Sequence, residues 1–168
     1  MGSKQDLLLT LMRDAMHEFV DNARAALKEA SGPSEEIVAL ARSHVLFNGR
    51  NLLKSYVTDN EIRSLDGPNR ARIVRIRDSY EELWKDVVSR GVQGGDFHIT
   101  DQKLFRLAAI QMCNGVTYWY SPAGEMSLTA IADEIAGFCL AMAGHGSSES
   151  WRGRLPGGSQ PQGATASE

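Results

Sequence analysis

The spacing of apolar residues most narrows what this chain can fold into. Between Lys4 and Ala30, apolar side chains recur every three or four residues, so they fall on one side of an α-helix. This stripe consists of Leu7, Leu8, Leu11, Met12, Ala15, Met16, Phe19, Val20 and Ala23. Ser3 and Asp6 fit a capping box for that helix. Few segments show the two-residue alternation of a strand, and the pattern therefore predicts an all-α fold.

Turn and capping residues divide the first half of the chain into helices. Gly32-Pro33 predicts the end of the first helix, and Ser34-Glu35-Glu36 predicts the cap of the second. Gly49 and Asp59-Asn60 predict breaks on either side of a short helix near residues 52–57.

The second half contains three further predicted helices, which makes about six in all. Gly67-Pro68 begins a long helix that is predicted to stop at Gly91. Thr100-Asp101 is predicted to open the next-to-last helix, and Ser127 is placed to cap the last one. Pro122-Ala123-Gly124 predicts a turn between these two helices.

Composition indicates one globular domain followed by a tail. The chain has 168 residues, of which 42% are hydrophobic, and residues 1–144 contain nearly all of its helical pattern. Residues 145–168 are rich in Gly, Ser, Pro and Gln, so we predict a disordered tail. Cys113 and Cys139 both fall within helical patterns and are predicted to be small packing residues.

Charge and hydropathy exclude several functional classes. The formal net charge of −3 argues against nucleic-acid binding by these residues alone, since such proteins usually carry a basic excess. No apolar run is long enough to span a membrane, and the N-terminus lacks the zones of a secretory signal. We therefore expect no membrane partner and a cytoplasmic protein.

Several segments together resemble one known family. The segment Ser3 to Leu8 reads Ser-Lys-Gln-Asp-Leu-Leu, a glycine-rich loop follows from Gly91 to Phe97, and Thr117 to Gly124 contains Trp-Tyr-Ser-Pro-Ala-Gly. These segments, with the start of the last helix at Ser127, resemble the C-terminal effector-binding and dimerisation domain of TetR/AcrR-type transcriptional regulators. The resemblance covers residues 3–143. It implies a helical bundle whose last two helices form a four-helix bundle with those of a second copy.

The same resemblance implies an N-terminal DNA-binding domain that this sequence does not contain. In the family, roughly 45 residues with a helix-turn-helix precede the segment that begins here at Ser3, and that motif reads DNA in the major groove. Operator DNA would therefore be bound only through the missing domain. A misplaced start codon, an excised domain and a naturally headless paralogue each explain the difference.

The family also implies a function. The segment from Trp119 to Ser127 is similar to regulators of fatty-acid and steroid catabolism, so we expect a transcriptional repressor released by a small apolar or acyl-CoA-like effector. The alternative is a headless interaction protein that forms mixed dimers with an intact regulator. Flexible methionines and aromatic side chains suit an apolar pocket, although the same spacing is typical of plain core. The candidate pocket residues are Met12, Met16, Phe19, Tyr56, Leu83, Trp84 and Met112.

The last two helices carry the candidate homodimer interface. Small residues allow helices to approach closely, and the family dimerises through these helices. The candidate interface residues are Ala108, Gly115, Trp119, Ile131, Ala132, Ile135, Ala136, Cys139 and Ala143. The alternative is that the same stripe packs inside the chain.

A basic cluster at the start of the long helix is a candidate phosphate site. It comprises Arg70, Arg72, Arg75 and Arg77, and guanidinium groups bind phosphates through paired donors. A CoA-type effector would need such a site at the pocket mouth. The alternative is a solvated helix face.

Catalysis and metal binding have little support in the sequence. Asp14 and His17 lie one helical turn apart, but no second Asp/Glu-x-x-His element accompanies them. No serine occupies a Gly-x-Ser-x-Gly elbow. We therefore predict no catalytic residue, no metal and no cofactor, and an enzyme ranks third behind the two binding hypotheses.

Overall fold

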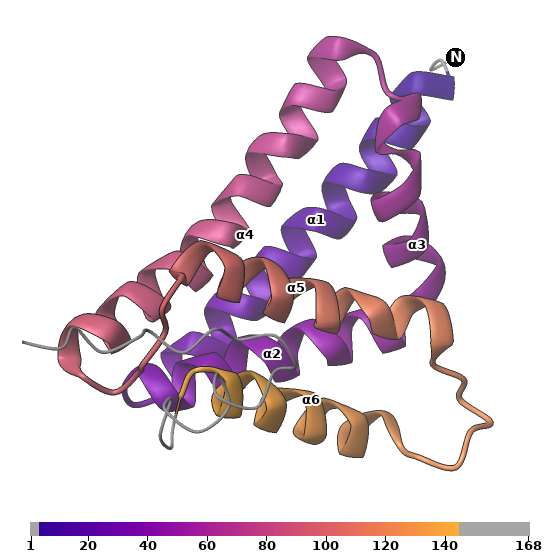
Figure 1. The fold of residues 1–168 in the computed structure, drawn as a ribbon. Helices are drawn as coiled ribbons and strands as arrows, with labels where there is room; N and C mark the ends of the chain where they lie inside the picture. Colours follow the sequence, from indigo (N-terminus) through magenta and orange to yellow (C-terminus); the bar gives the residue numbers. More distant parts are fainter. Residues whose placement is uncertain (1–3, 145–168) are drawn as a thin grey trace, which may run out of the picture.

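The computed structural model describes residues 4–144, and every regular element in that range is helical (Figure 1). The elements are α1 (Lys4–Lys28), α2 (Pro33–Arg50), α3 (Leu52–Asn60), a short 3-10 helix η1 (Glu61–Ser64), α4 (Gly67–Gly94), α5 (Gln102–Trp119) and α6 (Leu128–Met142). The predicted all-α fold with six α-helices is confirmed. The predicted cap at Ser3 and the predicted tail at 145–168 lie outside the described residues.

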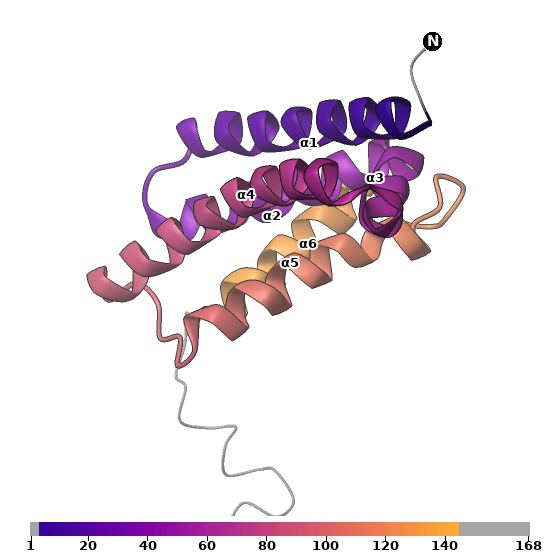
Figure 2. The same ribbon diagram turned by 90° about the horizontal axis from the view of Figure 1, so that it is seen from above.

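Helix α2 is the centre of the fold. It packs against α1, α3, α4, α5 and α6, and Figure 2 shows α1 on one side of it with α5 and α6 on the other. The core side chains Met12, Ile37, Leu40, Val45 and Trp84 are completely buried around it. Each such side chain contributes about 1.5–3 kcal/mol through removal of its apolar surface from water. The cysteines predicted to pack in the core are also buried and unpaired.

The predicted cap at Ser127 and the predicted helix start at Thr100-Asp101 are confirmed, and the predicted cap of the second helix is wrong. Asp101 and Ser127 each accept a hydrogen bond from the backbone N–H three residues later, at 2.9 and 3.1 Å. Helix α2, however, begins at Pro33, and Gly32 is its N-cap with φ 87°. Ser34 therefore lies inside the first turn, because Pro33 already supplies a backbone angle suited to a helix start.

Two glycines predicted to break or end helices lie inside them. A Cβ at Gly49 would lie 2.2 Å from Cδ1 of Leu128, and a Cβ at Gly91 would lie 2.1 Å from Cδ2 of Phe97. Both glycines therefore allow a neighbouring side chain to approach the helix backbone closely. Helix α4 ends instead at Gly94, and its C-cap is Gly95, whose φ of 82° is left-handed.

The substitution Gly91→Ala should destabilise the protein. The added methyl group would overlap the buried ring of Phe97, and overpacking of this kind costs about 1–3 kcal/mol. Gly67→Ala is the control, since nothing lies within 4 Å of a Cβ there. Urea unfolding should show a lower free energy for Gly91→Ala and little change for Gly67→Ala. Equal values for the two variants would contradict close packing at Gly91.

Candidate functional site

A buried imidazole joins three helices at the centre of the molecule. His44 of α2 donates its Nε2–H to Oδ1 of Asn114 on α5, with 2.8 Å between the atoms. Its Nδ1 accepts a hydrogen bond from the hydroxyl of Tyr80 on α4, at 2.9 Å. The ring of Phe19 from α1 lies edge-on to His44, with ring centroids 4.8 Å apart. One neutral tautomer of His44 thus satisfies both hydrogen bonds.

Burial keeps this cluster uncharged at neutral pH. Removal from water lowers the pKa of His44 to about 4, and the hydrogen bond to Asn114 opposes that shift only in part. Burial also raises the pKa of the Tyr80 hydroxyl well above its ordinary value. The cluster is therefore a set of neutral hydrogen-bonding groups and supplies no charge to the interior.

A small cavity lies beside His44. Its volume is about 40 Å³, and roughly 10–15 Å³ of such space is enough to hold one water molecule. It is lined by Ala15, Met16, Phe19, His44, Phe47, Asn48, Ser55, Thr58, Asp59 and Asn114. The residues that α1 contributes are all apolar, those from α3 and α5 are polar, and α2 contributes the polar His44 and Asn48 together with the apolar Phe47.

One polar group of the cavity wall has an open hydrogen-bonding position. Ser55 is 6% exposed, and its Oγ has no hydrogen-bond partner among the described residues. Its neighbours on α3 are satisfied, since Thr58 Oγ1 donates to Lys54 O at 2.8 Å and Asp59 pairs with Arg77 at 3.2 Å. A buried hydroxyl without a partner costs about 1–3 kcal/mol, so Ser55 favours a bound molecule with a hydrogen-bonding atom.

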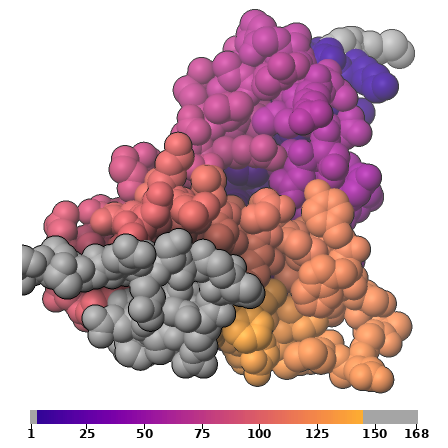
Figure 3. All heavy atoms as spheres, in the orientation of Figure 1, coloured from indigo at the N-terminus to yellow at the C-terminus, as the bar shows by residue number. Residues whose placement is uncertain are grey.

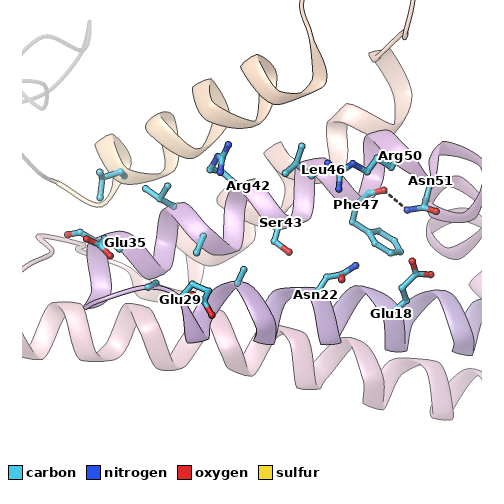
Figure 4. Close-up of a pocket in the computed structure, with 16 residues that line it drawn as sticks. Glu18, Asn22, Glu29, Glu35, Arg42, Ser43, Leu46, Phe47, Arg50 and Asn51 are labelled. Atoms are coloured by element: carbon cyan, nitrogen blue, oxygen red, sulfur yellow. Dashed lines mark hydrogen bonds between the residues drawn. The ribbon is translucent and has the colours of Figure 1, made fainter.

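A much larger groove runs along the outer face of α2. Its volume is about 840 Å³, and it lies between α1 and α2 and reaches Leu140 of α6. Figure 4 shows Glu18, Asn22 and Glu29 on the α1 side of this groove, whereas Arg42 and Arg50 extend from α2. The groove has a size suited to a small-molecule ligand.

An exposed apolar face covers the outer sides of α5 and α6. Figure 3 shows part of α5, in salmon to orange, and a smaller part of α6, in yellow-orange, on the lower half of the molecular surface. The large side chains Leu104, Leu107, Trp119, Phe138 and Met142 are between 44% and 64% exposed. On α5, Leu104 and Leu107 lie one helical turn apart, and Tyr118 and Trp119 are exposed near the end of the helix. Apolar patches of this kind mark interaction surfaces in soluble proteins.

Comparison with known proteins assigns the chain to a family. Residues 30–143 match the family model described as tetracyclin repressor-like, C-terminal domain. The chain belongs to the TetR family. Proteins of this family are transcription regulators and not enzymes.

Individual relatives agree with this assignment. The fatty acid metabolism regulator protein of Bacillus subtilis strain 168 is 26% identical over 140 residues, which cover 79% of this chain and 70% of the relative. The TetR regulator PfmR of Thermus thermophilus is 27% identical, with a TM-score of 0.76 over 83% of this chain and 76% of that one. AibR, crystallised with isovaleryl coenzyme A and operator DNA, shares the fold at 23% identity, with a TM-score of 0.74 over 81% and 74% of the two chains.

The seven pocket residues predicted from the TetR resemblance separate in the structure. Met16 and Phe19 line the small cavity. The others line neither the cavity nor the groove, and they are Met12, Tyr56, Leu83, Trp84 and Met112. Met12 and Trp84 are fully buried core, and Tyr56 is 48% exposed and packs its ring on Tyr118. The prediction placed apolar residues alone around the ligand, and the cavity instead has a polar wall.

The sequence contained one signal for that polar wall. His44 falls on the apolar stripe of α2 with Ile37, Leu40 and Ala41, so a histidine interrupts an otherwise buried face. Ser55 and Asn114 carry no such signal, because neither stands out from exposed polar residues until α3 and α5 are packed together.

Two arginines of the predicted phosphate site bind backbone carbonyl groups of neighbouring segments instead. Arg70 donates to the carbonyl oxygens of Arg63 and Leu65 at 3.0 Å, and Arg77 donates to Thr58 O at 2.8 Å. None of Arg70, Arg72, Arg75 and Arg77 lines the cavity or the groove. Arg70 and Arg77 instead hold the α3–η1 segment against α4.

The predicted dimer interface is corrected on α6. Its small residues face α2 inside the chain, where Ala132 and Cys139 are fully buried, so they leave no surface for a partner. The buried members of the predicted set are Ile131, Ala132, Ile135, Ala136, Cys139 and Ala143. On α5, Ala108 and Trp119 are exposed and Gly115 is half-buried, so these three remain candidates.

Neither a metal site nor a membrane-spanning helix is found among residues 4–144. No group of three or more His, Cys, Asp or Glu side chains between residues 4 and 144 could hold a metal ion. His17 and Asp14 are both exposed, and Asp14 pairs with Arg13 at 2.9 Å. Within the same range, no helix is both long enough and apolar enough to cross a bilayer.

Stability should fall as the pH drops below about 6.5. The unfolded chain binds a proton at His44 near pH 6.5, whereas folded His44 stays neutral until about pH 4, so the unfolded state binds more protons between these values. The slope from this one group approaches about 1.4 kcal/mol per pH unit. The measurement is the free energy of urea unfolding at pH 7.5, 6.5 and 5.5.

His44→Gln should flatten this dependence, although it also lowers stability at pH 7.5 by disturbing the hydrogen bonds to Tyr80 and Asn114. His17→Gln is the matched control, because His17 is exposed. A pH dependence that survives in His44→Gln would show that His44 is not its origin.

Proposed function

We propose that this chain is the effector-binding and dimerisation part of a TetR-family transcriptional repressor. Its effector is a small acyl compound with at least one hydrogen-bonding atom, of the acyl-CoA class. The observation that carries this proposal is the unpartnered Oγ of Ser55 in a central cavity whose other walls include Met16 and Phe19. Such a mixture of apolar surface and a few fixed polar groups is typical of ligand sites.

The relatives support the acyl class. The Bacillus subtilis relative is a fatty acid metabolism regulator, and the same fold in AibR binds isovaleryl coenzyme A. A long unbranched alkyl chain alone would leave His44, Asn114 and Ser55 facing hydrocarbon. A carbonyl, hydroxyl or thioester oxygen would instead give Ser55 its missing partner.

The position of the cavity supports a switch. A volume of about 40 Å³ holds only a few non-hydrogen atoms, so an acyl ligand must displace wall residues. Ala15, Met16 and Phe19 belong to α1, whose N-terminal end lies far from α5 and α6 (Figure 1). A ligand that moves α1 would move a DNA-binding domain attached to its N-terminal end. The ligand thereby favours the arrangement that binds operator DNA less well.

The exposed face of α5 and α6 is the proposed homodimer interface in a cytoplasmic regulator. Its large exposed side chains include Leu104, Leu107 and Phe138, and it lies on the opposite side of α2 from α1 (Figure 2). Two copies related by a two-fold axis would bury it in a four-helix bundle. The alternative, a mixed dimer with an intact regulator, would use the same face, and the mass of the complex separates the two.

Phe138→Glu should separate the dimer into monomers. Phe138 is 53% exposed on the apolar face, and a carboxylate there would be buried without a partner in the dimer. Leu53→Glu is the control, since Leu53 is 77% exposed on α3 and lies outside this face. Light scattering coupled to size exclusion should show half the mass for Phe138→Glu alone. Retention of the dimer by Phe138→Glu would refute this interface.

Ser55→Ala should weaken effector binding by about tenfold, which corresponds to about 1.4 kcal/mol for one lost hydrogen bond. The melting temperature of the free protein should stay equal or rise, because the substitution removes an unsatisfied buried hydroxyl. Titration calorimetry with isovaleryl-CoA and octanoyl-CoA measures the affinity, with Ser64→Ala as an exposed control. Failure of every such ligand to bind the unmodified chain would refute the acyl class.

A further inference from the structure

Phe47 belongs to both the small cavity and the large groove. It is the one residue among the described linings that the two spaces share. Figure 4 shows its ring extending from α2 toward the α1 side of the groove, near Glu18 and Asn22. The residue is only 6% exposed, so its side chain fills the boundary between the two spaces. Rotation of one side chain would therefore open the cavity to the groove.

Beside this boundary, the two sides of the groove carry different charges. On the α1 side, Glu18 is paired with Lys54 at 3.3 Å. On the α2 side, Arg50 makes no hydrogen bond or ion pair with any residue that the structure describes, and it is exposed. Arg50 follows Phe47 by three residues, which places the two side chains next to each other on the helix surface. A free guanidinium therefore stands directly at the boundary.

The remaining charges of the groove do not oppose an anion at this place. Glu35 lies at the opposite end of α2 and accepts a hydrogen bond from the backbone N–H of Ser31 at 2.8 Å. Glu29 lies on the α1 side, toward that same end (Figure 4). Arg42 is on the α2 side and forms an ion pair with Asp133 of α6. The α2 side of the groove near Phe47 is therefore basic.

The opposite edge of the cavity is unsuited to an anion. Asp59 lines the cavity there, and its carboxyl group pairs with Arg77 at 3.2 Å. An anionic ligand arriving past Asp59 would have to compete with that carboxylate for Arg77. The Phe47 edge also has a paired carboxylate, Glu18, which binds Lys54, but it adds the unpaired guanidinium of Arg50. Among the residues that line the two spaces, this unpaired positive charge distinguishes the Phe47 edge from the Asp59 edge.

We propose that the groove between α1 and α2 is the entrance and outer half of the effector site, and that the cavity is its inner half. The side chain of Phe47 separates the two halves. Arg50 binds the anionic end of an acyl ligand whose acyl part enters the cavity. This inference rests on the proposed function. The shared chemistry is an anionic group on an acyl chain, and either a free carboxylate or the phosphates of an acyl-CoA provides it.

The two ligand sources differ in reach. A carboxylate would occupy Arg50 alone. Arg42 lies eight residues before Arg50, which is about 12 Å along a helix that rises 1.5 Å per residue. The phosphates of an acyl-CoA, at the end of a long pantetheine arm, would extend along the groove to Arg42, whereas a free acid would not.

The test compares octanoyl-CoA, octanoate and the uncharged 1-octanol by titration calorimetry. Arg50→Gln should weaken binding of the charged ligands about tenfold and leave 1-octanol unchanged, because only the anionic end contacts Arg50. Arg42→Gln should weaken octanoyl-CoA and not octanoate. Arg24→Gln removes the same charge from α1 outside the groove, so it should change none of the three affinities.

The proposed role of Phe47 is tested by the rate at which the ligand associates. Phe47→Ala should increase the association rate of octanoyl-CoA several-fold in stopped-flow measurements, since the partition would no longer have to move. Val92→Ala is the control for a general loosening of the core. Val92 of α4 packs against the hydrophobic core and lines neither the cavity nor the groove. Equal association rates for both variants would overturn the role of Phe47.

The remaining outcomes separate the inference from the function on which it rests. If Ser55→Ala weakens binding but Arg50→Gln behaves like Arg24→Gln, the cavity is the effector site and the groove is not its entrance. If no ligand of the panel binds the unmodified chain, both the acyl function and this inference are wrong.

Discussion

The burial of α2 on nearly all sides is the constraint on which the rest of the structure depends. Five other α-helices pack against it, and its one buried ionisable side chain, His44, must find partners inside the protein. It finds them on two different helices, through Tyr80 of α4 and Asn114 of α5. These two hydrogen bonds fix the position of α2 relative to α4 and α5. They also place polar groups beside the cavity, so the same constraint shapes the candidate ligand site.

The proposed ligand site and the proposed dimer interface lie on different sides of this central helix. The cavity and the groove lie where α2 meets α1, and the exposed apolar stripe lies on the far sides of α5 and α6. A ligand can therefore act on α1 without breaking a dimer formed through α5 and α6. This separation is what a regulator requires, since a signal at one surface must change the position of another element while the assembly persists.

Glycines and small residues show how sequence patterns mislead when the packing partner is unknown. Gly49 and Gly91 were predicted to break or end helices, yet each sits in a helix where Leu128 or Phe97 approaches the backbone. The alanine stripe of α6 was correctly predicted to allow close approach of another helix. The partner was wrong, because α2 of the same chain occupies that surface. A small residue predicts that another helix or side chain packs closely there, but it does not identify which one.

The all-α fold, the family and most helix limits could be predicted from the sequence. Apolar periodicity, the capping side chains Asp101 and Ser127, and the motifs of the last two helices are local features that a linear chain displays. The candidate site, in contrast, depends on how the helices pack together. The unpartnered hydroxyl of Ser55, the shared position of Phe47 and the free guanidinium of Arg50 depend on residues that are distant in sequence. Whether a polar group is satisfied is a property of its neighbours in space, and no local pattern records it.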